Sequence, residues 1–106
     1  MISKFNVLFL DKNNFPMVFN QFAINVSVCI GTTKDNAFCN ARCDIKSVAH
    51  FSVKNFPKGK YYIRGAWKEG YVNFTKPLTI EVENDKITCE GKQITEDETL
   101  VIKANF

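Results

Sequence analysis

The sequence has no long apolar run, a single histidine and none of the glycine-rich motifs that bind phosphate. Roughly 20 consecutive apolar residues are needed to cross a bilayer, so we expect no membrane insertion. No P-loop or dinucleotide fingerprint occurs, and we expect no cofactor. His50 is the only imidazole that could activate a Cys or Ser nucleophile. Because it lies in an alternating segment beside Phe51, we expect a solvated or half-packed side chain and a chain that is not an enzyme.

The chain also lacks a strong charge of one sign. Its net charge of +3 is well below the concentrated basic stripe of nucleic-acid-binding proteins, so no nucleic-acid partner is expected. The distribution is uneven, with a net charge of +6 over residues 42–76 and −4 over residues 77–106. If the fold keeps these segments apart, the asymmetry favours head-to-tail contacts or an anionic partner. The alternative is solvated strand faces that differ in sign.

The length of 106 residues is that of one domain, so residues 1–106 are expected to form a single unit. At this size about two-thirds of the surface can be buried without a disulfide or a metal. Ten phenylalanines, with many valines and isoleucines, favour pleated, half-buried surfaces over helices. The composition therefore indicates sheet.

Alternating apolar residues predict that most of the chain forms short strands. The clearest alternation lies at residues 22–30. Residues 5–10 are apolar on both faces, which is typical of a strand covered on two sides. Pro57 and Gly59 predict a tight turn that leads into a strand with Tyr61, Ile63 and Trp67 on its core side. We expect seven or eight strands in an all-β sandwich or barrel, at residues 5–10, 22–30, 37–45, 48–53, 61–68, 78–83, 87–89 and 100–104.

Two segments resemble modules of surface proteins. The run FSVKNFPKGKYYI at 51–63, followed by Gly70 and Tyr71, is similar to the aromatic strand, Pro-x-Gly-x-Tyr turn, second strand and Gly-Tyr of immunoglobulin-like and carboxypeptidase-regulatory-like (transthyretin-like) modules. The run FNVLFLDKNNFPM at 5–17 is similar to their first strand and Asp-x-Asn-x-Pro turn, with Asn14 and Phe15 where glycine is usual. The resemblance covers about a third of the chain. It implies an immunoglobulin-like β-sandwich of mostly antiparallel strands, in a non-catalytic module used for adhesion, display or stiffening.

The four cysteines leave three interpretations open. Cys39 and Cys43 have the spacing of a first pair of zinc ligands, but a second close pair is missing. In an extended strand these two would lie about 13 Å apart, too far to share one ion or one bond. Disulfides are the second interpretation, with Cys29 and Cys39 across a hairpin as the first pairing to test. Buried or half-buried thiols, including Cys89, are the third, and we expect no metal site.

The carboxylates cluster at residues 81–90 and 96–98, mostly at outward or loop positions. They lack the buried pairing that general acid–base catalysis requires, so no catalytic residue is assigned. Calcium binding by Glu96, Asp97 and Glu98 is one alternative. A solvated turn is the expected one.

Exposed aromatic side chains near a basic strand are the remaining functional signal. Alternation directs Tyr62, Arg64 and Lys68 away from the core side of their strand, and Tyr71 and Phe74 follow in the next connection. Such rings anchor protein neighbours or stack on sugars. These five residues are the candidate interaction surface, unless Tyr62 packs against the second sheet or a loop.

We therefore expect a non-enzymatic structural or interaction module displayed on a larger assembly, either a virus capsid decoration or a cell-surface adhesion domain. The expected partners are protein neighbours in a capsid or envelope, together with surface glycans. The alternative function is a sandwich that binds a small ligand, carbohydrate or lipid. The first apolar run ends at Asp11 without a cleavage site, so no signal peptide is visible. The expected location is the virion or the cell surface.

Overall fold

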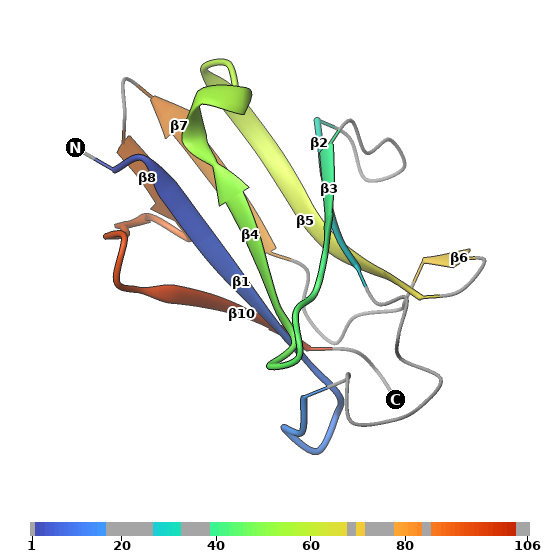
Figure 1. Cartoon of the computed structure of the whole chain (residues 1–106). Coiled ribbons are helices and arrows are strands. Elements are labelled where there is room, and N and C mark those ends of the chain that lie inside the picture. The colour runs from blue at the N-terminus through green and yellow to red at the C-terminus, as the bar shows by residue number, and fades with distance from the viewer. Residues whose placement is uncertain are drawn as a thin grey trace.

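The computed structural model of the chain is a sandwich of two β-sheets (Figure 1). It describes residues 2–16, 27–32, 39–67, 70–71, 78–83 and 86–103. The all-β sandwich expected from the alternation is confirmed. Its strands are β1 (Lys4–Leu10), β2 (Ser27–Gly31), β3 (Cys39–Arg42), β4 (Val48–Ser52), β5 (Gly59–Trp67), β6 (Gly70–Tyr71), β7 (Leu78–Glu83), β8 (Lys86–Cys89), β9 (Lys92–Gln93) and β10 (Thr99–Lys103), and a 3-10 turn at Val53–Asn55 follows β4.

The two sheets differ in width. The three-stranded sheet has the order β10-β1-β4, and the larger sheet has the order β3-β2-β5-β7-β8-β9 with β6 paired to β5. Only β1 and β10 run parallel among the described pairs, so the strands are mostly antiparallel, as predicted. Among the described residues, eight strands have four or more residues, in agreement with the predicted seven or eight, and β6 and β9 add two-residue pairings. The chain passes between the sheets at both edges, from β3 to β4 and from β9 to β10.

Alternation along each strand decides which side chains fill the space between the sheets. In β1, Phe5, Val7 and Phe9 are fully buried, because residues two apart share a face. The predicted core positions Tyr61 and Ile63 of β5 are also buried. The other buried strand residues belong to the same cluster: Val28, Ile30, Ala49, Phe51, Ile80, Val82, Ile87, Cys89, Leu100 and Ile102. The side chain of Trp67 and residues 22–26 lie outside the described part.

The turn that leads into β5 is held by an aromatic cluster. The Tyr61 ring packs edge-on against Phe56 at 5.4 Å between centroids, and Phe5 stacks on Phe51 at 5.2 Å. The Tyr61 hydroxyl donates a hydrogen bond to the carbonyl oxygen of Pro57. A large ring thus lies under the corner, which is the packing that the Pro-x-Gly-x-Tyr run predicts.

Gly65 lets the two sheets approach each other closely. A Cβ built on Gly65 would lie 2.1 Å from Cε2 of Phe9. The ring of Phe9 therefore packs directly on the backbone of β5, where only glycine fits. This contact joins the middle strand of the three-stranded sheet to an inner strand of the larger sheet.

Two turns at the same end of the sandwich (Figure 1) share one hydrogen-bond pattern. In each, an aspartate Oδ1 accepts the N–H groups two and four residues ahead, at 2.8 and 2.9 Å for Asp11 and at 2.8 and 3.1 Å for Asp44. The residue three ahead has a positive φ, 69° at Asn14 and 65° at Ser47. Asparagine tolerates this conformation better than most residues, so Asn14 can stand where similar modules have glycine. Ser47 is fixed by Phe9, whose carbonyl oxygen accepts the Ser47 hydroxyl at 2.6 Å.

Two local turns explain where the predicted strand bounds differ from the structure. A strand was expected over residues 37–45, but β3 ends at Arg42 because the chain turns at Asp44. The strand expected over residues 48–53 ends at Ser52, where the 3-10 turn begins. Both differences arise from local turn hydrogen bonds that the alternation does not report.

Candidate functional site

The predicted interaction surface is only partly within the described residues. Tyr62 and Arg64 lie on β5 and are half-buried, on the side opposite to the core residue Ile63. Tyr71 lies in β6, opposite Ala66 in the strand register. Lys68 and Phe74 lie outside the described residues. The structure therefore places Tyr62 and Arg64 together on the outer face of the larger sheet.

The charge asymmetry along the sequence does not separate into two halves where β5 and β7 pair. Lys60 of the basic segment lies opposite Glu81 of the acidic segment. Two positions farther along, Lys58 Nζ lies 3.4 Å from Glu83 Oε1, and both side chains are exposed. Antiparallel pairing thus places opposite charges side by side. The condition for head-to-tail attraction, that the segments be kept apart, is not met in this part of the molecule.

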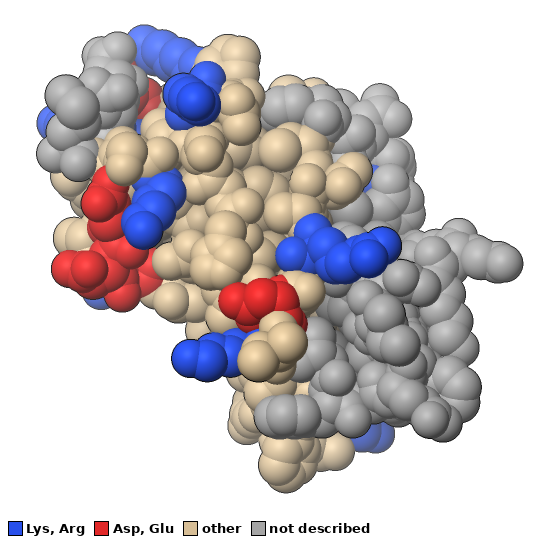
Figure 2. Space-filling view, viewed as in Figure 1, with Lys and Arg blue, Asp and Glu red and all other residues tan. Residues whose placement is uncertain are grey.

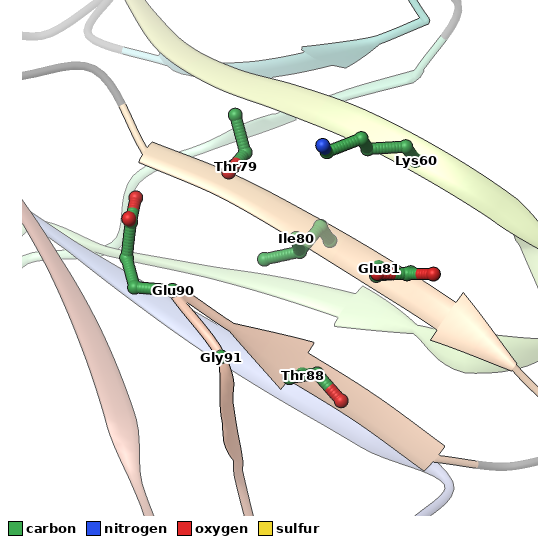
Figure 3. Close-up of a pocket in the computed structure, with 7 residues that line it drawn as sticks. All are labelled: Lys60, Thr79, Ile80, Glu81, Thr88, Glu90 and Gly91. Atoms are coloured by element: carbon green, nitrogen blue, oxygen red, sulfur yellow. The ribbon is translucent and has the colours of Figure 1, made fainter.

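The outer face of the larger sheet carries a hollow of about 280 Å³. Its lining residues come from β5, β7, β8 and the turn after β8, and we call this set the hollow: Lys60, Thr79, Ile80, Glu81, Thr88, Glu90 and Gly91. Cross-strand pairing brings them together, because Glu81 lies opposite Lys60 on one side and Thr88 on the other. Figure 3 shows the polar side chains of the hollow, whereas the side chain of Ile80 is buried in the core and only its strand borders the hollow. Tyr62 adjoins the hollow, since it lies opposite Thr79.

The outer face of the three-stranded sheet is the second surface. The register places Leu8 opposite Val48 on one side and Val101 on the other, so one apolar residue from each strand lies in a single row. We call these three residues the outer row. Leu8 and Val48 are half-buried, and Val101 is 44% exposed. In Figure 2 the centre of this face is uncharged, and charged side chains lie around it.

The neighbouring row of the same face is polar. His50 and Thr99 lie on either side of Asn6. His50 is exposed, as expected, and its Nδ1 and Nε2 contact Asn6 Oδ1 at 2.7 Å and Asp44 Oδ2 at 3.0 Å. The hydrogen bond from His50 and those from the backbone of Val48 and Lys46 lower the pKa of the Asp44 carboxyl below its usual value. These two contacts hold the imidazole ring of His50 in one orientation, exposed to solvent, beside the outer row.

The two aspartate turns present the largest exposed apolar side chains of the described residues. Ile45 is 85% exposed and Phe15 is 62% exposed. Each lies in the turn that begins at Asp44 or Asp11, at one end of the sandwich (Figure 1). Sequence reasoning did not single out the outer row or these tips. The signal was available in residues 5–10, which are apolar on both faces.

The structure describes the side chains of Cys39, Cys43 and Cys89, and for Cys29 it gives the strand position. Cys39 and Cys43 are half-buried, and Cys89 is buried in β8. Burial raises the pKa of Cys39, and burial together with the nearby Asp44 charge raises the pKa of Cys43 to about 11, although a hydrogen bond with Ser47 acts in the opposite direction. In the register Cys39 lies opposite Ile30, and Cys29 lies opposite Asn40. The Cys29–Cys39 disulfide stays a prediction.

The acidic turn before β10 makes contacts within the protein. The Glu96 carboxylate accepts hydrogen bonds from the backbone N–H and the hydroxyl of Ser3. These bonds lower the pKa of Glu96, and they tie the start of the chain to this turn. Figure 2 shows acidic side chains gathered on that side of the molecule. No group of three or more His, Cys, Asp or Glu side chains within the described residues is arranged to hold a metal ion.

Comparison with known proteins identifies no family. No protein-family model matches the chain, and no curated protein resembles it in sequence. Within the described residues no helix has the length and hydropathy needed to cross a bilayer. Membership of the immunoglobulin-like or transthyretin-like modules therefore stays a prediction from the two resembling segments.

Proposed function

We propose that the chain is a non-enzymatic interaction module that docks on a protein neighbour in a larger assembly. The observation that carries this proposal is the outer row of Val48, Leu8 and Val101. A sheet that packs on one side alone normally alternates apolar residues inside with polar residues outside. Here one outer position of each of three adjacent strands is aliphatic, and the register brings the three into one row. One face of β1 is already buried against the larger sheet. A protein partner on the outer face would bury the other apolar face of β1 as well.

The surroundings of the outer row support a protein partner. Protein interfaces have an apolar centre with few charges and a polar rim. The outer row is bordered by the polar row of His50, Asn6 and Thr99, and Lys103 lies opposite Leu10 on the other side. The centre of the face is uncharged (Figure 2). The assembly that we propose is a virus capsid or a cell envelope, so that the module acts as a capsid decoration or an adhesion-type domain on the virion or the cell surface.

Sedimentation of material from the native source tests this proposal. The wild-type chain should move through a density gradient with particles or envelope fragments, far from the position of a free 12.1 kDa protein. Val101→Lys should release it, because a charge placed at the centre of an interface weakens binding by about 30-fold or more. Gln93→Lys is the matched control, since it adds the same charge at an exposed strand position of the larger sheet. Wild-type chain at the top of the gradient, or equal release of both variants, would overturn the proposal.

A further inference from the structure

We propose that the hollow on the larger sheet binds one pyranose ring of a glycan. This binding does not depend on the docking of the outer row, because the two sheets present their outer faces to opposite sides of the sandwich. The ligand class follows from the charge, the size and the aromatic margin of the hollow.

The charges of the lining favour a neutral, polyhydroxylated ligand. The hollow combines the ammonium of Lys60, the carboxylates of Glu81 and Glu90 and two threonine hydroxyls. A simple anion would meet two carboxylates, and a simple cation would meet Lys60, so either would be repelled on one side. Sugar hydroxyls both donate and accept hydrogen bonds. They can donate to the carboxylates and accept from the ammonium, and hydrogen bonds to charged groups are the stronger ones.

The charged ends of two lining side chains converge on a third. Figure 3 shows the ammonium end of Lys60 and the carboxylate of Glu90 both directed toward Thr79, from opposite sides. Although Lys60 and Glu81 lie opposite each other on neighbouring strands, Lys60 extends along the sheet toward Thr79 in this view. Lys60, Thr79 and Glu90 therefore border a common space that one ring of hydroxyls can occupy, and Glu81 and Thr88 line the other end of the hollow.

The size of the hollow and its margin fit a single sugar ring. A volume of about 280 Å³ is just below the roughly 300–1,000 Å³ typical of small-molecule pockets. Tyr62 lies next to Thr79 across the strand pair and is half-buried, so part of its ring stays accessible. An aromatic ring at this position offers an apolar face to the C–H side of a pyranose, as tyrosine does at binding surfaces. At the opposite corner, a side chain on Gly91 would meet no atom within 4 Å, so the hollow is open there.

Titration of the ¹⁵N-labelled chain with methyl pyranosides tests the proposal. The probes are the methyl glycosides of glucose, galactose, mannose and N-acetylglucosamine, with glycerol as a polyol control. At least one glycoside should give saturable amide shifts confined to β5, β7 and β8 around the hollow. Glu81→Gln should weaken this binding by about tenfold or more, as expected for a hydrogen bond to a charged group.

Glu83→Gln is the matched control, because Glu83 is an exposed residue on the same face of the same strand but outside the hollow. It should leave the affinity unchanged. Tyr62→Phe should keep the binding and Tyr62→Leu should weaken it, since only the ring is needed. The proposal is overturned if the amide shifts do not saturate with any glycoside at concentrations up to about 100 times a millimolar dissociation constant. It is also overturned if glycerol gives the same shifts. It is also overturned if the shifts map to the three-stranded sheet or if both glutamine variants lose binding equally.

Discussion

Replacing Gly65 by alanine would place a methyl group inside the space of the Phe9 ring. The new Cβ would lie 2.1 Å from Cε2, 2.5 Å from Cζ and 3.0 Å from Cδ2 of that ring. Carbon atoms pack best at about 3.5–4.0 Å, so the ring or the strand must move by about 1.5 Å. Neither moves easily, because Phe9 is fully buried and β5 is hydrogen-bonded to β2 and β7 on its two sides.

Overpacking a core in this way costs about 3 kcal/mol at the upper end of its usual range. Alanine regains about 0.5–1 kcal/mol over glycine within a strand. The net destabilisation of Gly65→Ala should be about 2 kcal/mol, which lowers the midpoint of thermal unfolding by roughly 8–15 °C in a domain of this size. Urea and thermal unfolding followed by circular dichroism measure both quantities.

A second variant separates this contact from a general intolerance of β5 to substitution. In a Phe9→Leu background the ring is absent, so Gly65→Ala should cost less than about 1 kcal/mol, and the two substitutions should show a coupling of at least 1 kcal/mol. An unfolding free energy of Gly65→Ala within 0.5 kcal/mol of the wild type would refute the reasoning. The same cost in both backgrounds would refute it as well.

Three further predictions concern the aspartate turns and Cys43. The pKa of the Asp44 carboxyl is lowered by folding, so its charge stabilises the fold above the unfolded-state pKa of 3.8, and this stabilisation is lost as the pH falls through the folded-state pKa. Asp44→Asn should therefore reduce the difference between the urea midpoints at pH 5 and pH 3. An unchanged difference would contradict this. The pKa of Cys43 is about 11 rather than 9.0, so the folded chain should have about 100-fold less thiolate at this position than the unfolded chain. Iodoacetamide labelling followed by mass spectrometry should therefore show a much slower reaction of Cys43 in buffer than in denaturant. Asn14→Ala should destabilise the chain by about 1 kcal/mol and Asn14→Gly should be close to neutral, because φ at Asn14 is 69°, a conformation that glycine adopts more easily than alanine. Equal unfolding midpoints for the two variants would show that the backbone conformation is not the cause.

The strands could be predicted because burial on one face leaves a period of two in the sequence. Phe5, Val7 and Phe9 follow that period and are fully buried, and the position of Tyr61 under its corner follows from the turn residues that precede it. The order of strands within each sheet is a different matter. The parallel pairing of β1 with β10 joins the two ends of the described chain, and no local pattern encodes a contact between residues more than 90 positions apart.

The candidate surfaces were harder to predict for the same reason. The outer row needs the registers of two strand pairs, β1 with β4 and β1 with β10, before Val48, Leu8 and Val101 become neighbours. The hollow needs the registers of β5, β7 and β8. Tyr62 and Arg64 could be selected from alternation within β5 alone, and the structure places both on the predicted side. The sum of charges along the sequence was a poor guide, because Lys58 and Glu83 belong to segments of opposite sign and form an ion pair.

The two proposed surfaces are compatible because a sandwich has two outer faces. The outer row belongs to the three-stranded sheet and the hollow belongs to the larger sheet, and packed sheets lie about 10 Å apart with their outer faces directed away from each other. A copy that docks through the outer row therefore leaves the hollow open to solution. Val101→Lys should then release the chain from its assembly without changing the affinity for a pyranoside. Glu81→Gln should weaken pyranoside binding without releasing the chain from its assembly. If either variant changes both properties, one surface is responsible for docking and for pyranoside binding.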